Sequence, residues 1–332
     1  MSILPDSCIR FEPIYQTRVW GGRGLEEHFG RHLPDSTSPF GESWEISARD
    51  EADSVVVGGT LAGKTLTQLW SDPNLRLSIF GEAAPQEERF PLLCKILDAR
   101  DRLSIQVHPP ADIAGELGGE PKTEVWYIAH AAPGAKLYAG VRHGVDEALF
   151  REAIESGRAE RCVRAIPVEK GQHIFIPSGR LHAIGAGLLI YEIQQNSDST
   201  FRVYDWNRPG IDGKPRQLHV EESLKCIDFE DVEPGMDEAE EIVLVECEHF
   251  RLEKHELAAG DSILVKTGGR FAIITVVEGT LRDGENVFKE GDFFIVPSGV
   301  KGEALKAETA AEILLTTWPW LNAGVTALAV GD

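Results

Sequence analysis

The amino-acid sequence predicts a mainly β protein, built from two small β-barrels with a few inserted or flanking helices. Most segments with a recognisable periodicity are short and rich in β-branched and aromatic residues, which is typical of strands. Glycine, proline and asparagine-type turn residues stand at the ends of these segments. In addition, one 12-residue pattern occurs twice along the chain, which predicts two copies of the same small β domain.

Nine segments carry the strand signal. They are residues 54–57, 103–107, 124–128, 173–176, 188–194, 242–246, 271–277, 293–296 and 312–316. Helical signals are fewer: residues 65–70 predict a short helix, and residues 146–155 begin at Asp146, a good capping residue, and end before Ser156 and Gly157. Because strands and helices do not alternate, a sandwich or barrel is favoured over an alternating α/β fold.

The acidic stretch at residues 228–241 is the best candidate for a linker between domains. Its charges repel one another, and the Pro234-Gly235 pair resists regular packing. A length of 332 residues also favours about two domains. We therefore place a boundary near Gly235, between a first domain of residues 1–235 and a second of residues 236–332.

The composition excludes several classes of protein. The chain has 54 acidic and 33 basic residues, and its formal net charge of −21 would repel nucleic acids and anionic membranes. The five cysteines lie far apart without a CxxC pair, which favours a reducing compartment over a disulfide framework. No apolar run approaches the roughly 18 residues of a membrane helix, and a signal-peptide pattern is absent at the start. We expect a cytoplasmic protein and leave open whether it is a monomer or a dimer.

The repeated pattern reads GQHIFIPSGRLH at residues 171–182 and GDFFIVPSGVKG at residues 291–302. Each copy predicts a glycine turn, a short strand and a Pro-x-Gly turn, and His173 is expected to point outward from its strand. The pattern resembles the second motif of the cupin family of jelly-roll β-barrels. The first copy has the motif's histidine, His182, whereas the second has Gly302 there. The resemblance implies one cupin-type barrel that can bind a metal and one that lacks metal ligands.

Four side chains form a candidate metal site. Gln106 and His108 are two residues apart on a predicted strand, so both point to the same face. Glu124 opens the next predicted strand, and His182 follows the Pro-x-Gly turn. Nitrogen and oxygen ligands suit zinc with an open coordination position, although iron or manganese could take the same set. The other histidines, His219 among them, lack this register and are interpreted as ordinary core or surface residues.

Several stretches together resemble the type I mannose-6-phosphate isomerases, a cupin family, and especially its shorter bacterial form. They are RVWGG at residues 18–22, GESWEIS at 41–47, FPLLCKIL at 90–97, LSIQVHP at 103–109, KTEVWY at 122–127, GRLHA at 179–183 and YEIQQNSDSTFRVYDW at 191–206. The resemblance covers nearly the whole chain. Any one stretch would be a weak signal, but their number and order make chance an unsatisfactory explanation.

The resemblance implies one zinc ion per chain, held by His108, Glu124 and His182. Gln106 falls on the position of a fourth ligand in longer members, and whether it binds the metal here stays open. The implied reaction interconverts mannose 6-phosphate and fructose 6-phosphate by proton transfer through an enediol-type intermediate. Such a reaction needs a base for the C2 proton and a cation that stabilises the developing oxyanion.

The resemblance also implies residues that act on the sugar phosphate. Arg202 falls on the family's essential arginine, and Lys95 and Lys122 fall on lysines near its sugar-phosphate pocket. Glu192 stands where longer relatives have an acidic candidate for proton transfer. Catalytic roles are thus expected for Arg202, Lys122 and Glu192, and substrate binding for Lys95, Lys122 and Arg202. The ordinary alternatives are a Lys95 on the exposed face of a strand and an Arg202 paired with Asp198 or Asp205 as scaffold.

Three other functions compete with this interpretation. The segment GGTLAGKT at residues 58–65 fits the phosphate-loop pattern G-x4-G-K-T, but alternating strands and helices are missing, so an ordinary glycine-rich loop is favoured. Another metal-dependent cupin enzyme, such as an iron oxygenase or an isomerase of different specificity, would use the same barrel but would not account for Lys95, Lys122 and Arg202. A non-catalytic sugar-phosphate-binding protein is the third.

Overall fold

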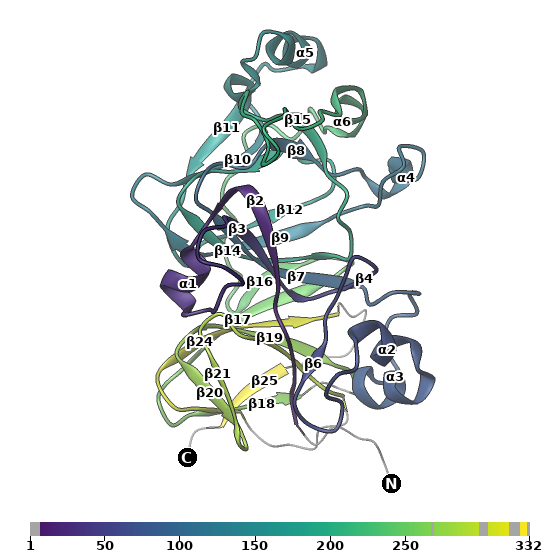
Figure 1. Ribbon diagram of the computed structural model, residues 1–332, viewed down its shortest axis with the longest axis vertical. Coiled ribbons are helices and arrows are strands. Elements are labelled where there is room, and N and C mark those ends of the chain that lie inside the picture. Colours follow the sequence, from purple (N-terminus) through teal and green to yellow (C-terminus); the bar gives the residue numbers. More distant parts are fainter. Residues whose placement is uncertain (1–6, 267–268, 299–304, 319–325, 331–332) are drawn as a thin grey trace. The chain divides into compact units, whose positions relative to one another are not determined.

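The computed structural model describes residues 7–266, 269–298, 305–318 and 326–330 (Figure 1). The chain divides into two compact units. One, the C-terminal unit, consists of residues 1–14, 44–93 and 238–332, and the other, the central unit, consists of residues 15–43 and 94–237. Antiparallel strands dominate both units, which confirms the predicted mainly β class. The arrangement as two barrels stays a prediction.

The C-terminal unit contains two large sheets. The first has the strand order β16 (Val243–Glu246), β17 (Arg251–Leu257), β24 (Ala311–Thr317), β19 (Ala272–Glu278), β22 (Phe293–Val296), β1 (Ile9–Phe11) and β6 (Val56–Val57). The second has the order β21 (Asn286–Lys289), β20 (Thr280–Asp283), β23 (Leu305–Ala307), β18 (Ser262–Lys266) and β25 (Thr326–Val330). The strand pair β4 (Ala48–Arg49) and β5 (Ala52–Asp53) and the helices α2 (Leu66–Ser71) and α3 (Pro73–Phe80) also belong to this unit.

Strand β1 joins the start of the chain to its C-terminal part. Ile9 pairs with Ile295 of β22, and Arg10 pairs with both Phe294 of β22 and Val57 of β6. Residues 1–14 and 44–93 therefore pack with residues 238–332, whereas the sequence placed them in a first domain ending at residue 235. Composition along the chain does not reveal pairing between strands from its opposite ends.

The glycine-rich segment at residues 58–65 forms a loop between β6 and α2. Val56 N–H donates to the carbonyl of Lys64 over 2.9 Å, and Gly63 N–H donates to that of Val56 over 3.0 Å. Strand β6 pairs antiparallel with β1 and is not the central parallel strand that precedes a phosphate loop. The interpretation as an ordinary strand-to-helix loop is confirmed.

The central unit contains the other two large sheets. The six-stranded sheet has the order β12 (His173–Ile176), β9 (Glu124–Ala131), β14 (Leu188–Gln195), β7 (Leu92–Ala99), β3 (Phe40–Ile46) and β2 (Ile14–Gly22), most of whose residues lie in this unit. The five-stranded sheet has the order β11 (Val163–Pro167), β10 (Lys136–Val141), β13 (His182–Ile184), β8 (Ile105–Val107) and β15 (Phe201–Tyr204). Apolar side chains of both sheets, among them Trp126, Ile190 and Leu137, form one buried cluster.

The helices of the central unit are short. They are α1 (Gly24–Phe29), α4 (Ala111–Ala114), α5 (Glu147–Glu155), α6 (Val220–Cys226) and the 3-10 helix η1 (Ala159–Cys162). Helix α5 lies where the sequence predicts it, because the Asp146 carboxylate accepts the Leu149 N–H over 2.8 Å and caps the first turn. None of the helices in the described ranges has the length and apolar character to span a bilayer.

The strands of the two sequence repeats are β12 and β22, as predicted. The outward orientation predicted for His173 is wrong: only 4% of this residue is exposed. The chain at Met236 and Asp237 lies along β12, where Asp237 N–H donates to the carbonyl of His173 over 3.3 Å. The end of the second repeat, including Gly302, lies outside the described residues.

Asp98 on β7 supplies the cap that α1 lacks on its own. Arg23 precedes the helix without a capping side chain, and the Asp98 carboxylate accepts the Gly24 N–H over 2.6 Å. Burial raises the pKa of Asp98 to about 6, against the opposing effect of hydrogen bonds from the Gly24 and Leu25 N–H groups. The folded protein therefore binds this proton more tightly than the unfolded chain does.

This raised pKa predicts a pH-dependent stability. The Asp98 carboxyl contributes stability that is present below about pH 4 and is lost as the pH rises through about 6. Between these limits the free energy of unfolding should fall by up to about 3 kcal/mol relative to an Asp98→Asn variant, which keeps an acceptor oxygen but does not titrate. Urea unfolding of both proteins across this range measures the difference, and parallel curves would contradict the prediction.

Candidate metal centre

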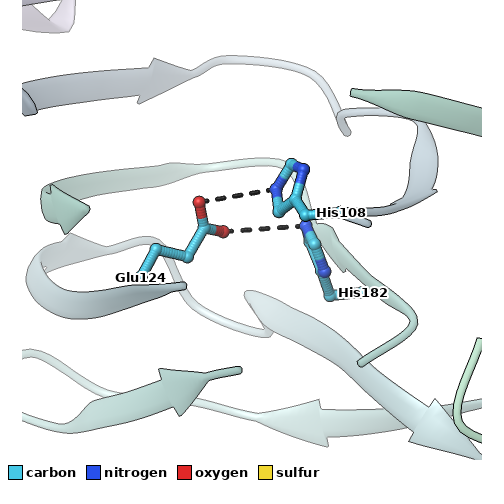
Figure 2. A group of neighbouring side chains, drawn as sticks. All are labelled: His108, Glu124 and His182. Atoms are coloured by element: carbon cyan, nitrogen blue, oxygen red, sulfur yellow. Dashed lines mark ion pairs between the residues drawn. The ribbon is translucent and has the colours of Figure 1, made fainter. Parts of the chain in front are cut away.

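His108, Glu124 and His182 converge in the interior of the central unit (Figure 2). His108 directly follows β8, His182 opens β13, and Glu124 opens β9. One ligand atom from each lies within 4.8 Å of the others, and all three residues are fully buried. The structure thus brings together three of the four metal ligands that the sequence predicts, two from the five-stranded sheet and one from the six-stranded sheet.

Backbone carbonyl groups orient both imidazoles. Nδ1 of His108 lies 2.8 Å from the carbonyl oxygen of Ser199, and Nδ1 of His182 lies 2.8 Å from that of Arg180. A carbonyl oxygen only accepts, so each Nδ1 carries the proton and each Nε2 keeps its lone pair, with the Lys122 ammonium 3.3 Å from Nε2 of His108 and the Gln106 amide nitrogen 3.3 Å from Nε2 of His182. The two Nε2 atoms lie 3.5 and 3.6 Å from the Glu124 oxygens. This is the arrangement in which neutral histidines bind a metal.

Burial keeps the imidazoles neutral. Burial, together with the neighbouring His108 and against the opposing effect of Glu124, lowers the pKa of His182 to about 3. The pKa of His108 is also lowered, first by burial and then by the ammonium of Lys122. Neither imidazole therefore has to lose a proton near neutral pH before it can bind a cation.

A glycine turn holds the two histidine segments together. Gly179, in the Pro-x-Gly turn before His182, donates its N–H to the carbonyl of His108 over 2.9 Å. Its φ of +91° is unfavourable for other residues, and a Cβ at this position would lie 3.2 Å from the carbonyl oxygen of Cys226. The glycine of the repeat is therefore required by the turn that places His182 beside His108.

Glu124 has the character of a metal ligand. Burial would raise its pKa, but the neighbouring Lys122 ammonium above all lowers the pKa well below its ordinary value, so the side chain is a carboxylate. Within the part of the chain that the structure describes, neither of its buried oxygens accepts a hydrogen bond of good geometry. The Lys122 ammonium lies 2.7 Å away and neutralises part of the charge. Buried carboxylate oxygens that face the Nε2 atoms of two neutral imidazoles fit a divalent cation.

Gln106 lies at the edge of this cluster. It pairs with His182 on one side and with Arg202 on the other across the five-stranded sheet. Its amide nitrogen lies 3.3 Å from Nε2 of His182, and its amide oxygen accepts a hydrogen bond from Ser104. Exchange of the two amide atoms would turn an oxygen toward the metal ligands, since the amide can be placed either way.

A cavity of about 290 Å³ adjoins the cluster in the central unit. Most of its lining side chains are polar or charged. The charged ones are Arg18, Glu42, Lys95, Lys122, Glu192, Asp198, Arg202 and Arg216. All four residues that the sequence predicts for catalysis and substrate binding, Arg202, Lys122, Glu192 and Lys95, thus face one cavity beside the candidate metal site.

Lys95 is buried and not exposed on a strand, which excludes the ordinary alternative for this residue. Its ammonium lies 3.6 Å from Glu192, 3.9 Å from Glu42 and 3.9 Å from Asp198. Glu192 is 3% exposed and accepts a hydrogen bond from the indole N–H of Trp126 over 2.9 Å. Burial raises the pKa of Glu192, Lys122 lowers it, and the net shift is upward.

Arg202 lies at another part of the cavity wall, on β15. Its guanidinium does not pair with Asp198 or Asp205, and instead one Nη donates to the carbonyl of Gln217 over 2.9 Å. Burial and the neighbouring Arg216 lower the pKa of Arg202 to about 10, so it stays charged near neutral pH. Among the described residues its buried Nε has no acceptor. An arginine with unused donors in a cavity is suited to bind an anion.

Sequence reasoning missed several residues of the cavity. His219 was interpreted as ordinary, yet it lines the cavity, and its N–H donates to the carbonyl of Arg202 over 2.8 Å. Arg216 was not singled out, because residues 207–218 have neither strand nor helix periodicity. Glu42 and Arg18 form an ion pair at 2.9 Å, and both belong to stretches that carried the family resemblance, which was the available signal.

Comparison with known proteins agrees with this geometry. Residues 8–118 match the family model of the phosphomannose isomerase type I catalytic domain. The mannose-6-phosphate isomerase ManA of Bacillus subtilis is 37% identical over 322 residues, which cover 92% of this chain and 97% of that protein. The mannose-6-phosphate isomerase of Streptococcus mutans is 35% identical, with 87% of this chain and 94% of that protein covered.

Solved structures show the same fold. The crystal structure of the mannose 6-phosphate isomerase from Bacillus subtilis matches with a TM-score of 0.82 at 32% identity, covering 94% of this chain and 99% of that one. The apo form of the Salmonella typhimurium enzyme matches with a TM-score of 0.71 at 16% identity, over 94% of this chain and 99% of that one, a likeness of fold alone. Fold and site together define a cupin-type protein with a candidate metal centre beside a charged cavity. The chain belongs to the type I mannose-6-phosphate isomerase family, as the resemblance indicated.

The cluster predicts which side chains carry metal affinity. Glu124→Gln keeps the size of the side chain but removes the charge, and we expect the affinity for a divalent cation to fall more than about 100-fold. Gln106→Ala should lower it about 10-fold if the amide binds the metal and leave it unchanged otherwise. Competition with a chromogenic chelator measures both, with the exposed Gln172→Ala as control. Unchanged affinity in Glu124→Gln would remove this residue from the site.

Proposed function

We propose that this chain is a zinc-dependent aldose-ketose isomerase that interconverts D-mannose 6-phosphate and D-fructose 6-phosphate. The observation that carries the proposal is the buried His108, Glu124 and His182 cluster beside a cavity lined with lysine and arginine, in a chain that belongs to this family. Relatives that align over nearly their whole length are named mannose-6-phosphate isomerases. Metal dependence belongs to the family, and the identity of the metal as zinc is part of the proposal.

The cavity suits a small anionic sugar. Its volume of about 290 Å³ is at the lower end of the range for small-molecule pockets. Lys95, Lys122 and Arg202 supply positive charge in a protein whose net charge is −21, so the attraction for a phosphate is local. An iron oxygenase built on the same barrel would have no use for these three cations.

His108, Glu124 and His182 would hold the metal, with Gln106 as a candidate fourth ligand. When bound, the metal supplies Lewis-acid polarisation of substrate oxygens. Lys122 lies 2.7 Å from Glu124 and 3.3 Å from Nε2 of His108, so it stands between these ligands and the cavity. There it would hold a substrate oxygen and stabilise its negative charge while Arg202 binds or stabilises another anionic group.

Glu192 would carry the proton between C2 and C1. Its raised pKa makes the carboxylate a stronger base than an exposed glutamate, and its Oε2 is held by the Trp126 indole. Its other oxygen, Oε1, lies 3.6 Å from Lys95 and 4.0 Å from Lys122, which keep the deprotonated form accessible. A base of this kind gives up a proton as readily as it takes one, as an isomerisation in two directions requires.

We assign catalysis to the central unit. This places the active site in residues 94–237 together with residues 15–43. The second predicted domain, residues 236–332, is assigned a role that does not involve a metal. The predicted cytoplasmic location and the choice between monomer and dimer stay predictions.

A coupled assay tests the reaction. Fructose 6-phosphate formed from mannose 6-phosphate is measured with protein as purified, after chelation and after zinc is added back. We expect activity that is lost on chelation and restored by zinc. Restoration only by iron, together with oxygen consumption, would favour the oxygenase, and the absence of turnover in the zinc-loaded protein would refute the isomerase.

The Glu192→Gln variant tests the base. We expect kcat to fall about 100- to 10,000-fold while metal content is unchanged. In the natural protein, kcat/KM should fall as acid protonates Glu192, and because its pKa is raised this limb should lie above the ordinary pH range of a glutamate. The exposed Glu155→Gln is the matched control. Near-normal turnover in Glu192→Gln would exclude this residue as the base.

A further inference from the structure

Asp205 is a buried carboxylate that binds two guanidinium groups at once. It directly follows β15 and is 6% exposed. Its Oδ1 accepts from Nε and Nη2 of Arg208 over 3.2 and 3.0 Å and from Nη2 of Arg216 over 2.6 Å. Its Oδ2 accepts from Nε of Arg216, also over 2.6 Å. Arg216 is therefore held by both oxygens in a two-pronged pairing, the geometry that fixes a guanidinium most firmly.

The two arginines have different surroundings. Arg208 also donates to the carboxylate of Asp101 over 3.1 Å, and it does not line the cavity. Arg216 lines the cavity together with Arg202 and His219. Arg208 donates both of its hydrogen bonds to one oxygen of Asp205, whereas Arg216 engages both oxygens, so the guanidinium that is paired two-pronged is the one that faces the space where a ligand would lie.

The backbone brings Arg216 to the same place as Arg202. The Arg202 guanidinium donates to the carbonyl of Gln217, the residue that follows Arg216, over 2.9 Å. The N–H of His219 donates to the carbonyl of Arg202 over 2.8 Å. These two hydrogen bonds hold Arg202, Arg216 and His219 together at one part of the cavity wall. Lys95, in contrast, faces the carboxylates of Glu42, Glu192 and Asp198.

This part of the wall is cationic on the cavity side. Two like-charged guanidinium groups so close together repel each other, and a buried countercharge behind them offsets the repulsion without occupying the cavity. Asp205 can act as this countercharge, because it accepts hydrogen bonds from Arg216 but does not itself line the cavity. The guanidinium N–H groups of Arg202 and Arg216 are therefore suited to donate hydrogen bonds to a doubly charged oxyanion.

On the basis of the proposed isomerase function, we propose that Asp205 is a positioning residue that orients Arg216, so that Arg216 and Arg202 together bind the phosphate group of the substrate. Asp205 touches neither the sugar nor the metal ligands, and acts through Arg216. The assignment leaves the reacting carbons of the sugar to the side of the cavity that holds Lys122 and Glu192.

The sign of the effect of Asp205→Asn separates positioning from charge alone. If Asp205 only contributed a negative charge, its removal would strengthen binding of an anion and lower KM for mannose 6-phosphate. If it orients Arg216, its loss releases the guanidinium and KM rises. We expect KM to rise about 10-fold and kcat to change less than 3-fold, with metal content maintained and the variant still folded at the assay temperature, although its Tm falls because two guanidinium groups lose their countercharge. Asp212→Asn, the same charge change at an exposed position in the same segment, is the matched control.

A double-mutant cycle tests whether Asp205 acts through Arg216. Arg216→Gln alone should raise KM at least as much as Asp205→Asn, and the double variant should resemble Arg216→Gln, because Arg208, the guanidinium that the carboxylate still holds, does not line the cavity. Fully additive effects, an unchanged KM or a lowered KM in Asp205→Asn would each overturn the proposal.

Calorimetric binding of fructose 6-phosphate and of inorganic phosphate separates this proposal from the proposed reaction. Both dissociation constants should rise about 10-fold in Asp205→Asn. If the natural protein binds these anions and the variant binds them more weakly, yet neither protein turns over the sugar, the isomerase function fails and the role of Asp205 stands. If the natural protein is an active isomerase and the variant binds both anions as tightly, the function stands and the role of Asp205 fails.

Discussion

The buried negative charge of Glu124 is the constraint on which the site depends. A carboxylate with no exposed surface would be strongly destabilising if it were unpaired, so the chain must place positive charge or a cation against it. His108 and His182 cannot provide that charge, because burial keeps them neutral. Lys122 provides part of it at 2.7 Å, and a divalent cation held by the two imidazoles and the carboxylate would provide the rest.

The same balance of charge extends through the cavity. Lys122 lies within 4.0 Å of both Glu124 and Glu192, and Lys95 lies within 4.0 Å of Glu192, Glu42 and Asp198. Glu124 and Glu192 share Lys122, so protonation of one changes the charge that the other experiences, and these two carboxyl groups titrate as a set. Substrate binding adds a further anion to this set, which links the ionisation of Glu192 to occupancy of the cavity.

Local patterns predicted much of the fold and of the site. The spacing of Gln106 and His108, the turn before His182 and the capping residue Asp146 all depend on near neighbours, so they can be recognised in sequence. The pairing of β1 with β22 joins opposite ends of the chain and has no local signal. Arg216 and His219 escaped recognition for a similar reason: contacts with Asp205 and Arg202 place them in the cavity, and no periodicity marks their segment. Long-range contacts, which a single sequence does not display, account for what was missed.

The two imidazoles of the metal centre are oriented by main-chain carbonyl groups of Ser199 and Arg180 and not by side chains. Evolution can therefore exchange the side chains at these two positions while the ligands keep their orientation, provided that the backbone path is maintained. A site supported in this way tolerates substitutions around it, because the acceptors that orient its ligands are backbone carbonyl groups, which every residue has. Members of such a lineage can lose most of their shared residues and still present the same ligands.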